Sequence, residues 1–188
     1  MEDIITYMIE EQWGDDLKGD RKRFLLKLAK ESAENSDIAS KIGSMLIFNQ
    51  LLEEYLKDIV EYSAYYIKAE IWPADVDLSF DFSKANFGDL IRSFKRFAMK
   101  EYNRDVILND LTKYNKKRNE VVHHLFGIED LSALAAELDE YAEIAEELFY
   151  LLLEYDNCIC EKFCDLSTRV DFREFLEFGN KKKEDGNG

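Results

Sequence analysis

Residues that break helices are scarce in this chain, and their scarcity limits the folds it can adopt. The 188 residues include one proline and eight glycines. Two of these glycines, Gly186 and Gly188, stand at the very end of the sequence. Proline and glycine are the strongest local signals for the end of a helix. With a hydrophobic content of 46%, the chain can also build a sizeable core. The sequence therefore predicts an all-α fold, a helical bundle with two long helices and short accessory helices.

Apolar residues that recur at three- and four-residue steps mark the expected helices. The clearest pattern starts after Ser36 or Asp37, either of which can cap a helix, and ends near Ile71, before Pro73. Residues 73–83 alternate loosely, and we interpret them as an extended loop rather than a strand. The other helices are predicted over residues 3–13, 21–34, 86–99, 103–126, 130–164 and 169–178, with Gly14 and Gly19 separating the first two and with Asn86 and Asp130 as caps.

The chain shows no repeat and no interdomain linker. We expect an N-terminal helical extension over residues 1–35, a helical bundle over residues 36–180 and a polar tail over residues 181–188. No apolar run approaches the ~20 residues that span a bilayer. The acidic start Met1-Glu2-Asp3 also lacks the features of a signal peptide. A cytoplasmic protein without a membrane partner is the expectation.

Charge is distributed unevenly along the chain. The 25 Lys and Arg residues face 40 Asp and Glu residues, for a formal net charge of -15. Such a balance speaks against nucleic-acid binding by the surface as a whole, although it permits a local basic site. Acidic residues crowd positions 129–161. The cations gather in a different region: Arg92, Lys95, Arg96, Lys100, Arg104, Lys113, Lys116, Lys117 and Arg118.

Both histidines of the protein follow this basic region directly, in the stretch from Lys116 to His124. A histidine near its reference pKa of about 6.5 can accept or donate a proton at neutral pH. Arginine stays charged and can hold a phosphodiester through two donors. RNA supplies its own nucleophile, the 2′-hydroxyl. Arg118 and His123 therefore suffice for metal-independent RNA cleavage that leaves a 2′,3′-cyclic phosphate.

The spacing Arg118-Asn119-x-x-x-His123, near the end of a helix in an all-α chain, resembles the motif of the HEPN superfamily (higher eukaryotes and prokaryotes nucleotide-binding). That motif is Arg, a polar residue, three to five further residues, then His. The resemblance covers residues 37–165 and implies a helical bundle. It also implies a metal-independent endoribonuclease, a toxin or phage-defence effector that acts as a homodimer on RNA, without a cofactor and with an antitoxin or regulatory protein as a further partner.

The resemblance assigns a role to each residue of the motif. Arg118 would hold the scissile phosphate, His123 would be the acid–base residue, and Asn119 would orient the pair or bond the phosphate. His124 gives an equally permitted spacing and is the alternate or a helper. Some family toxins carry a tyrosine two residues after the histidine, which an antitoxin modifies, but Leu125 stands there in this chain. Candidate RNA contacts are Lys113, Lys116, Lys117, Arg92, Lys95 and Arg96.

Helical geometry restricts how this motif can work. Five residues on a straight helix are separated by about 140° around its axis, so Arg118 and His123 do not converge on one phosphate. Either the helix breaks near the motif, or two copies of the chain combine around a two-fold axis. We predict the homodimer, with both residues at its interface.

Other interpretations of the same residues stay open. The histidines can interact with the dipole at a helix end without a catalytic role. Lys116, Lys117 and Arg118 can form a solvated face that pairs with Glu120. The phenylalanines favour the core over base stacking: Phe80, Phe82, Phe87 and Phe94. The functional alternatives to an endoribonuclease are a non-catalytic HEPN-like domain that binds nucleotide, RNA or a protein, and a structural helical partner protein.

Two features of the sequence suggest a metal site only weakly. Cys158, Cys160 and Cys164 are an odd set without a second cluster, which favours ordinary thiols over structural zinc. Glu120-Val121-Val122-His123 has the Glu-x-x-His unit of di-iron bundles, but such a site needs two units from different helices. The sequence predicts no metal site.

Overall fold

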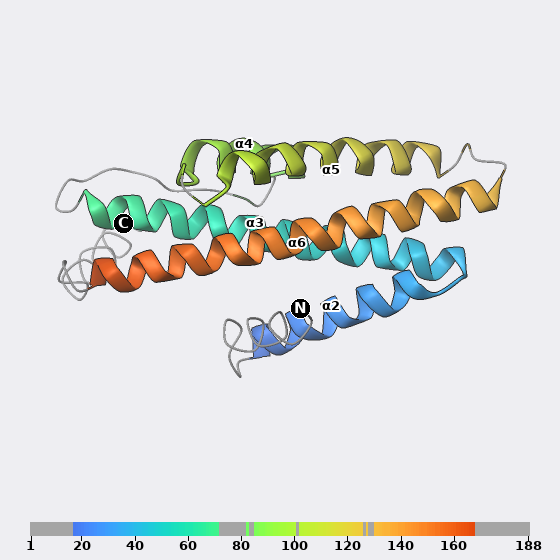
Figure 1. Cartoon of the computed structure of the whole chain (residues 1–188), viewed down its shortest axis with the longest axis horizontal. Helices are drawn as coiled ribbons and strands as arrows, with labels where there is room; N and C mark the ends of the chain where they lie inside the picture. The colour runs from blue at the N-terminus through green and yellow to red at the C-terminus, as the bar shows by residue number, and fades with distance from the viewer. Residues whose placement is uncertain are drawn as a thin grey trace, which may run out of the picture.

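The computed structural model of the protein describes residues 17–71, 82, 85–100, 102–125, 127 and 130–167. These residues form five helices and no strand (Figure 1), which confirms the predicted all-α bundle. The helices expected over 3–13 and 169–178, the tail 181–188 and the loop 73–83, except Phe82, lie outside the described residues. None of the described helices has the length and apolar character that crossing a membrane requires.

Two long helices, α3 (Ile38–Glu70) and α6 (Leu131–Ser167), form the centre of the bundle. Their 33 and 37 residues correspond to about 50 and 55 Å of helix. They pack against each other and run in the same direction, whereas α2 and α5 run in the opposite direction (Figure 1). Helix α3 ends and α6 begins at opposite ends of the bundle, and α5 carries the chain from one end toward the other (Figure 1).

The caps predicted from the sequence begin these helices. Asp37 caps α3, where its Oδ1 accepts a hydrogen bond from the backbone N–H of Ser40 at 2.8 Å. Helix α6 begins after Asp130, which accepts from the backbone N–H of Ser132 at 2.9 Å. Each side-chain oxygen satisfies an N–H group that has no partner within the helix. The predicted ends of α3 and α6, near Ile71 and Cys164, lie within three residues of the observed ends at Glu70 and Ser167.

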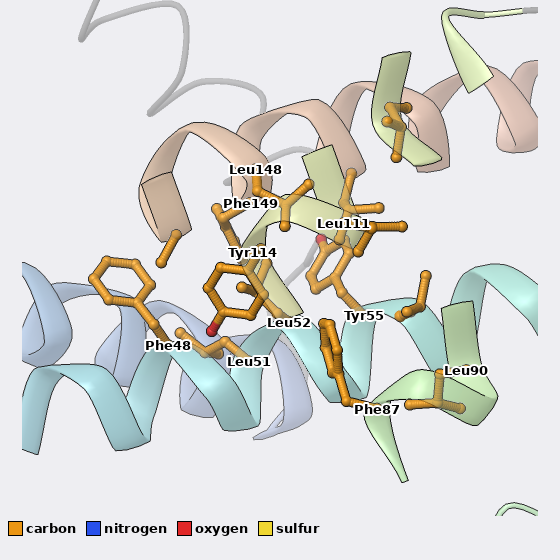
Figure 2. Close-up of a cluster of buried hydrophobic side chains, with 14 of the residues drawn as sticks. Phe48, Leu51, Leu52, Tyr55, Phe87, Leu90, Leu111, Tyr114, Leu148 and Phe149 are labelled. Atoms are coloured by element: carbon orange, nitrogen blue, oxygen red, sulfur yellow. The ribbon is translucent and has the colours of Figure 1, made fainter. Parts of the chain in front are cut away.

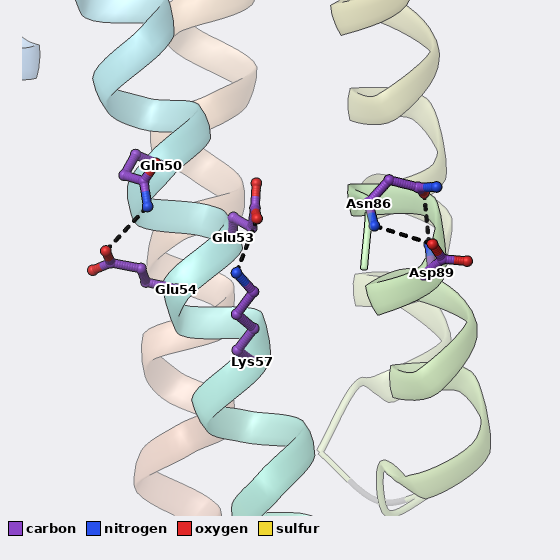
Figure 3. Close-up of polar contacts among 6 residues, drawn as sticks. All are labelled: Gln50, Glu53, Glu54, Lys57, Asn86 and Asp89. Atoms are coloured by element: carbon purple, nitrogen blue, oxygen red, sulfur yellow. Dashed lines mark hydrogen bonds and ion pairs between the residues drawn. The ribbon is translucent and has the colours of Figure 1, made fainter. Parts of the chain in front are cut away.

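Helix α4 (Phe87–Phe97) begins with a reciprocal capping box, which Figure 3 shows. The Asn86 side chain accepts from the backbone N–H of Asp89, and the Asp89 carboxylate accepts from the backbone N–H of Asn86, both at 3.0 Å. The helix ends at Phe97, two residues before the predicted end. The capping box fixes the start of α4 at Phe87, whose ring lies 5.7 Å from the guanidinium carbon of Arg118 in the candidate motif.

Helix α2 (Leu17–Glu34) begins four residues before the predicted start and contains Gly19. Gly19 therefore does not end a helix. A glycine costs a helix only about 1 kcal/mol relative to alanine, and α2 offsets this cost by burying Leu26 and Ala29 in the bundle core. Leu26 and Ala29 of the predicted extension thus share the core of α3 and α6.

Aromatic side chains join four helices in this core (Figure 2). Tyr55 of α3 and Phe149 of α6 meet edge to face with ring centroids 5.3 Å apart. Phe87 of α4 meets Tyr114 of helix α5 (Arg104–His124) at 5.5 Å. Offset and edge-on ring pairs add to the stabilisation that burial provides. The Tyr114 ring also lies 5.1 Å from the ring of Tyr141 on α6, so this layer of rings holds α5 against α4 and α6.

The phenylalanines expected in the core are there, where the structure describes them. Phe87 and Phe94 are buried, and Phe82 is partly buried against the same cluster. Phe80 lies outside the described residues.

Candidate functional site around helix α5

Helix α5 carries the whole motif from Arg118 to His123 without a break. The backbone N–H of Leu125 still donates to the carbonyl of Val121 at 2.9 Å, so regular helix geometry persists to the end. The helix break that sequence geometry left open is therefore absent. Arg118 and His123 leave an unbroken helix about 140° apart.

Arg118 faces the interior of the bundle. It continues the stripe of α5 residues Ile107, Leu111, Tyr114 and Val121, all of which are buried. From Ile107 to Val121 the stripe advances by four, three, four and three residues, and Arg118 occupies the fourth of its five positions. An apolar residue is expected there. The side chain is half-buried, and its guanidinium carbon lies 5.7 Å from the centroid of the Phe87 ring. It forms no hydrogen bond or ion pair with any other residue in the described part of the chain.

The other cations of α5 are paired with carboxylates. Exposed pairs of this kind stabilise a protein by less than about 1 kcal/mol, but each one reduces the positive field of its cation. The pairs are Arg104–Asp105 at 2.9 Å, Lys113–Asp110 at 3.0 Å, Lys116–Glu120 at 3.6 Å and Lys117–Glu140. Among the described residues, Arg118 is the cation of α5 without a carboxylate partner.

The basic residues predicted on α4 lie on its exposed side. Arg92 pairs with Asp89, and the guanidinium carbon of Arg96 lies 5.3 Å from the centroid of the Phe97 ring. Lys95 is exposed, and its backbone carbonyl accepts a hydrogen bond from Arg104. These contacts join the start of α5 to α4, and Lys95 and Arg96 stay exposed without a carboxylate partner among the described residues.

His123 and Asn119 both point to solvent on the outer side of α5. His124 is also exposed, and its Nδ1 lies 3.5 Å from a carboxylate oxygen of Glu137 on α6, a contact that is an ion pair when the imidazole is protonated. His123 has no such neighbour among the described residues. Its ring is accessible to a substrate or to a second protein molecule.

A polar cluster that the sequence analysis missed lies next to Arg118. The hydroxyls of Tyr114 and Tyr141 donate to Oδ1 of Asn49 at 2.6 and 2.5 Å, and the two hydroxyls also contact each other. Both tyrosines are completely buried. The cluster joins α3, α5 and α6 at the level of the aromatic layer. A buried tyrosine needs a hydrogen-bond partner for its hydroxyl. The sequence signal for this cluster was therefore Tyr114, a tyrosine at a core position of the α5 stripe.

Burial sets the acidity of these tyrosines. Removal from water raises the pKa of Tyr114 and Tyr141 strongly, although the nearby positive charge of Arg118 acts in the opposite direction on both. Burial likewise raises the pKa of Tyr155 to about 12. All three hydroxyls are therefore protonated at neutral pH and serve as hydrogen-bond donors.

We expect the free energy of unfolding to fall steeply above about pH 10, where tyrosines ionise in the unfolded chain but not in the folded one. The stabilisation is complete below the unfolded pKa and is lost as the pH rises toward the raised folded values. Each such tyrosine contributes a slope of about 1.4 kcal/mol per pH unit. Urea unfolding at several pH values between about pH 10 and pH 11 measures this slope of the free energy of unfolding. A Tyr155→Phe chain should show a shallower fall, and an equal slope in both chains would contradict the assignment.

Cys158 and Cys160, the cysteines whose side chains the structure describes, form no metal site in the described part of the chain. No group of three histidine, cysteine or acidic residues lies close enough together there to hold an ion. Cys158 is half-buried, and burial followed by the charges of Glu161 and Glu154 raises the pKa of its thiol. A raised pKa keeps the thiol protonated at neutral pH and unreactive.

Comparisons with protein-family models, with curated protein sequences and with solved structures give no match to this chain.

Proposed function

We propose that this chain is a metal-independent endoribonuclease of HEPN type, a toxin or phage-defence effector that cleaves RNA with a site assembled from two copies. Arg118 holds the scissile phosphate and its transition state, and His123 transfers the proton of the 2′-hydroxyl or the leaving group. Asn119 orients this pair or bonds the phosphate. An antitoxin or regulatory protein would control such an activity.

The observation that carries this proposal is the state of Arg118. It occupies a core-stripe position, it is half-buried against Phe87, and it has no carboxylate partner in the described structure. Placing an unpaired charge at the edge of a core is costly. An anionic substrate repays that cost, because hydrogen bonds between arginine and phosphate are strong when they are partly shielded from water.

Two copies are required because one chain does not bring the motif together. His123 lies on the solvent side of α5 and Arg118 on the bundle side of the same helix. A two-fold axis near this end of α5 would bring His123 of one copy toward Arg118 of the other. Each dimer would then contain two equivalent composite sites.

Direct cleavage assays test the proposal. The purified full chain should cleave single-stranded RNA in the presence of EDTA and leave 2′,3′-cyclic phosphate ends. Its expression should arrest growth, and His123→Ala should abolish both effects. Cleavage that disappears with EDTA would contradict the metal-independent mechanism.

A second candidate function is a non-catalytic HEPN-like domain that binds nucleotide, RNA or a protein partner. The pairing of Lys113, Lys116 and Lys117 with carboxylates favours it, and so does the net charge of -15. Proteins that hold long nucleic acids gain most of their affinity from unpaired cations. Purified protein that leaves varied RNAs intact would support this second candidate.

A further inference from the structure

Asn49 on α3 presents a fixed hydrogen-bond donor. Its side-chain oxygen accepts from both Tyr114 and Tyr141. An amide oxygen that is held in this way fixes the orientation of the amide nitrogen, which carries only donors. That nitrogen has no partner among the described residues, and it is not among their buried unpaired atoms, so it reaches solvent.

Arg118 is a second unpaired donor beside the same tyrosines. It lies one helical turn after Tyr114 on the same side of α5, and side chains of a helix lean toward its N-terminus, here toward Tyr114. Its guanidinium carbon lies 5.7 Å from the centroid of the Phe87 ring, which is itself 5.5 Å from the centroid of the Tyr114 ring. The guanidinium and the Asn49 amide nitrogen therefore both lie near Tyr114, with no carboxylate partner for either in the described structure.

We propose that Arg118 and Asn49 form a phosphate-binding site where α3 and α5 meet, which a single chain completes by itself. The ligand is a phosphate group of an RNA strand or of a nucleotide. Two groups that can only donate hydrogen bonds suit an anion and exclude a cation. Tyr114 and Tyr141 are positioning residues, since they fix the amide without reaching the ligand. The inference rests on the proposed function only in using Arg118 as a phosphate ligand, and it needs neither cleavage nor a second copy.

An Asn49→Asp substitution tests the site with little change in shape. The new carboxylate still accepts from both tyrosines, but it replaces the donor with a negatively charged oxygen. Gln50→Glu is the matched control, because it makes the same change of charge on the next residue. That residue is exposed, and its side chain donates a hydrogen bond to Glu54 at 3.1 Å (Figure 3).

Isothermal titration of the full chain measures binding of two probes. AMP carries a phosphate monoester, and a 2′-O-methyl RNA hexamer carries phosphodiesters that cannot attack themselves. We expect the wild-type and Gln50→Glu chains to bind one probe with similar affinity, and the Asn49→Asp chain to bind it at least about tenfold more weakly. Tighter binding of AMP assigns a nucleotide phosphate, and tighter binding of the hexamer assigns an RNA strand.

A second measurement keeps the test valid if Asn49→Asp fails to fold. In the wild-type chain, the NMR signal of the Asn49 side-chain amide should shift on addition of the bound probe. Absence of binding to both probes, unchanged affinity in Asn49→Asp, or an unmoved amide signal would overturn the inference. A wild-type chain that binds a probe through Asn49 but cleaves no RNA would support this site and reject the proposed endoribonuclease.

Discussion

An Arg118→Ala chain and a His123→Ala chain, each nearly inactive alone, should regain about a quarter of the wild-type RNA-cleaving activity when they are mixed in equal amounts. Half of the dimers then contain one copy of each variant, and one of their two composite sites carries both intact residues. Either substitution alone should lower the cleavage rate by about 10²–10⁴-fold, since each removes a proton-transfer group or a charge-stabilising donor. The cleavage rate of an end-labelled RNA measures the recovery.

His124→Ala is the control for this experiment. It removes the neighbouring imidazole, which contacts Glu137, and it leaves the Arg118–His123 spacing intact. A His124→Ala chain should therefore remain active by itself. A mixture of the two inactive chains that is no more active than either one would reject the composite site.

Phe149→Ala should lower the free energy of unfolding by about 3–5 kcal/mol. Phe149 is completely buried, and its ring lies 5.3 Å from that of Tyr55 (Figure 2) and 5.7 Å from that of Tyr150. Truncation removes these contacts and leaves a cavity between α3 and α6, the two longest helices. Urea unfolding followed by circular dichroism measures the loss.

Phe24→Ala makes the same truncation at a surface position and serves as the matched control. Phe24 on α2 is 63% exposed, so its truncation should change the stability by less than about 0.5 kcal/mol. Equal losses in the two variants would contradict the assignment of Phe149 to the core.

The helices could be predicted closely because their signals are local. Asp37, Asn86 and Asp130 cap the helices that their positions in the sequence indicate. The main error was at Gly19, which lies inside α2 rather than before it. A single glycine is a weak signal, and the burial of Leu26 and Ala29 against α3 outweighs it. That burial depends on residues far along the chain.

The motif could also be named from the sequence, but its surroundings could not. Spacing alone places Arg118 and His123 on different sides of a helix. It does not reveal that Lys117 pairs with Glu140, or that Asn49 joins Tyr114 and Tyr141. These partners are separated by between 23 and 92 positions in the chain. Their contacts depend on how the helices pack.

The sequence by itself determined the helical class, most of the helix limits and the angle between Arg118 and His123, because each follows from interactions within a few turns of one helix. Only the tertiary structure decided which cations keep a free charge. Packing of α5 against α6 neutralises Lys117, whereas packing against α4 places Arg118 over the Phe87 ring without a carboxylate. The charge that a residue offers to a ligand depends on its neighbours in space, and those neighbours are set when the helices pack together.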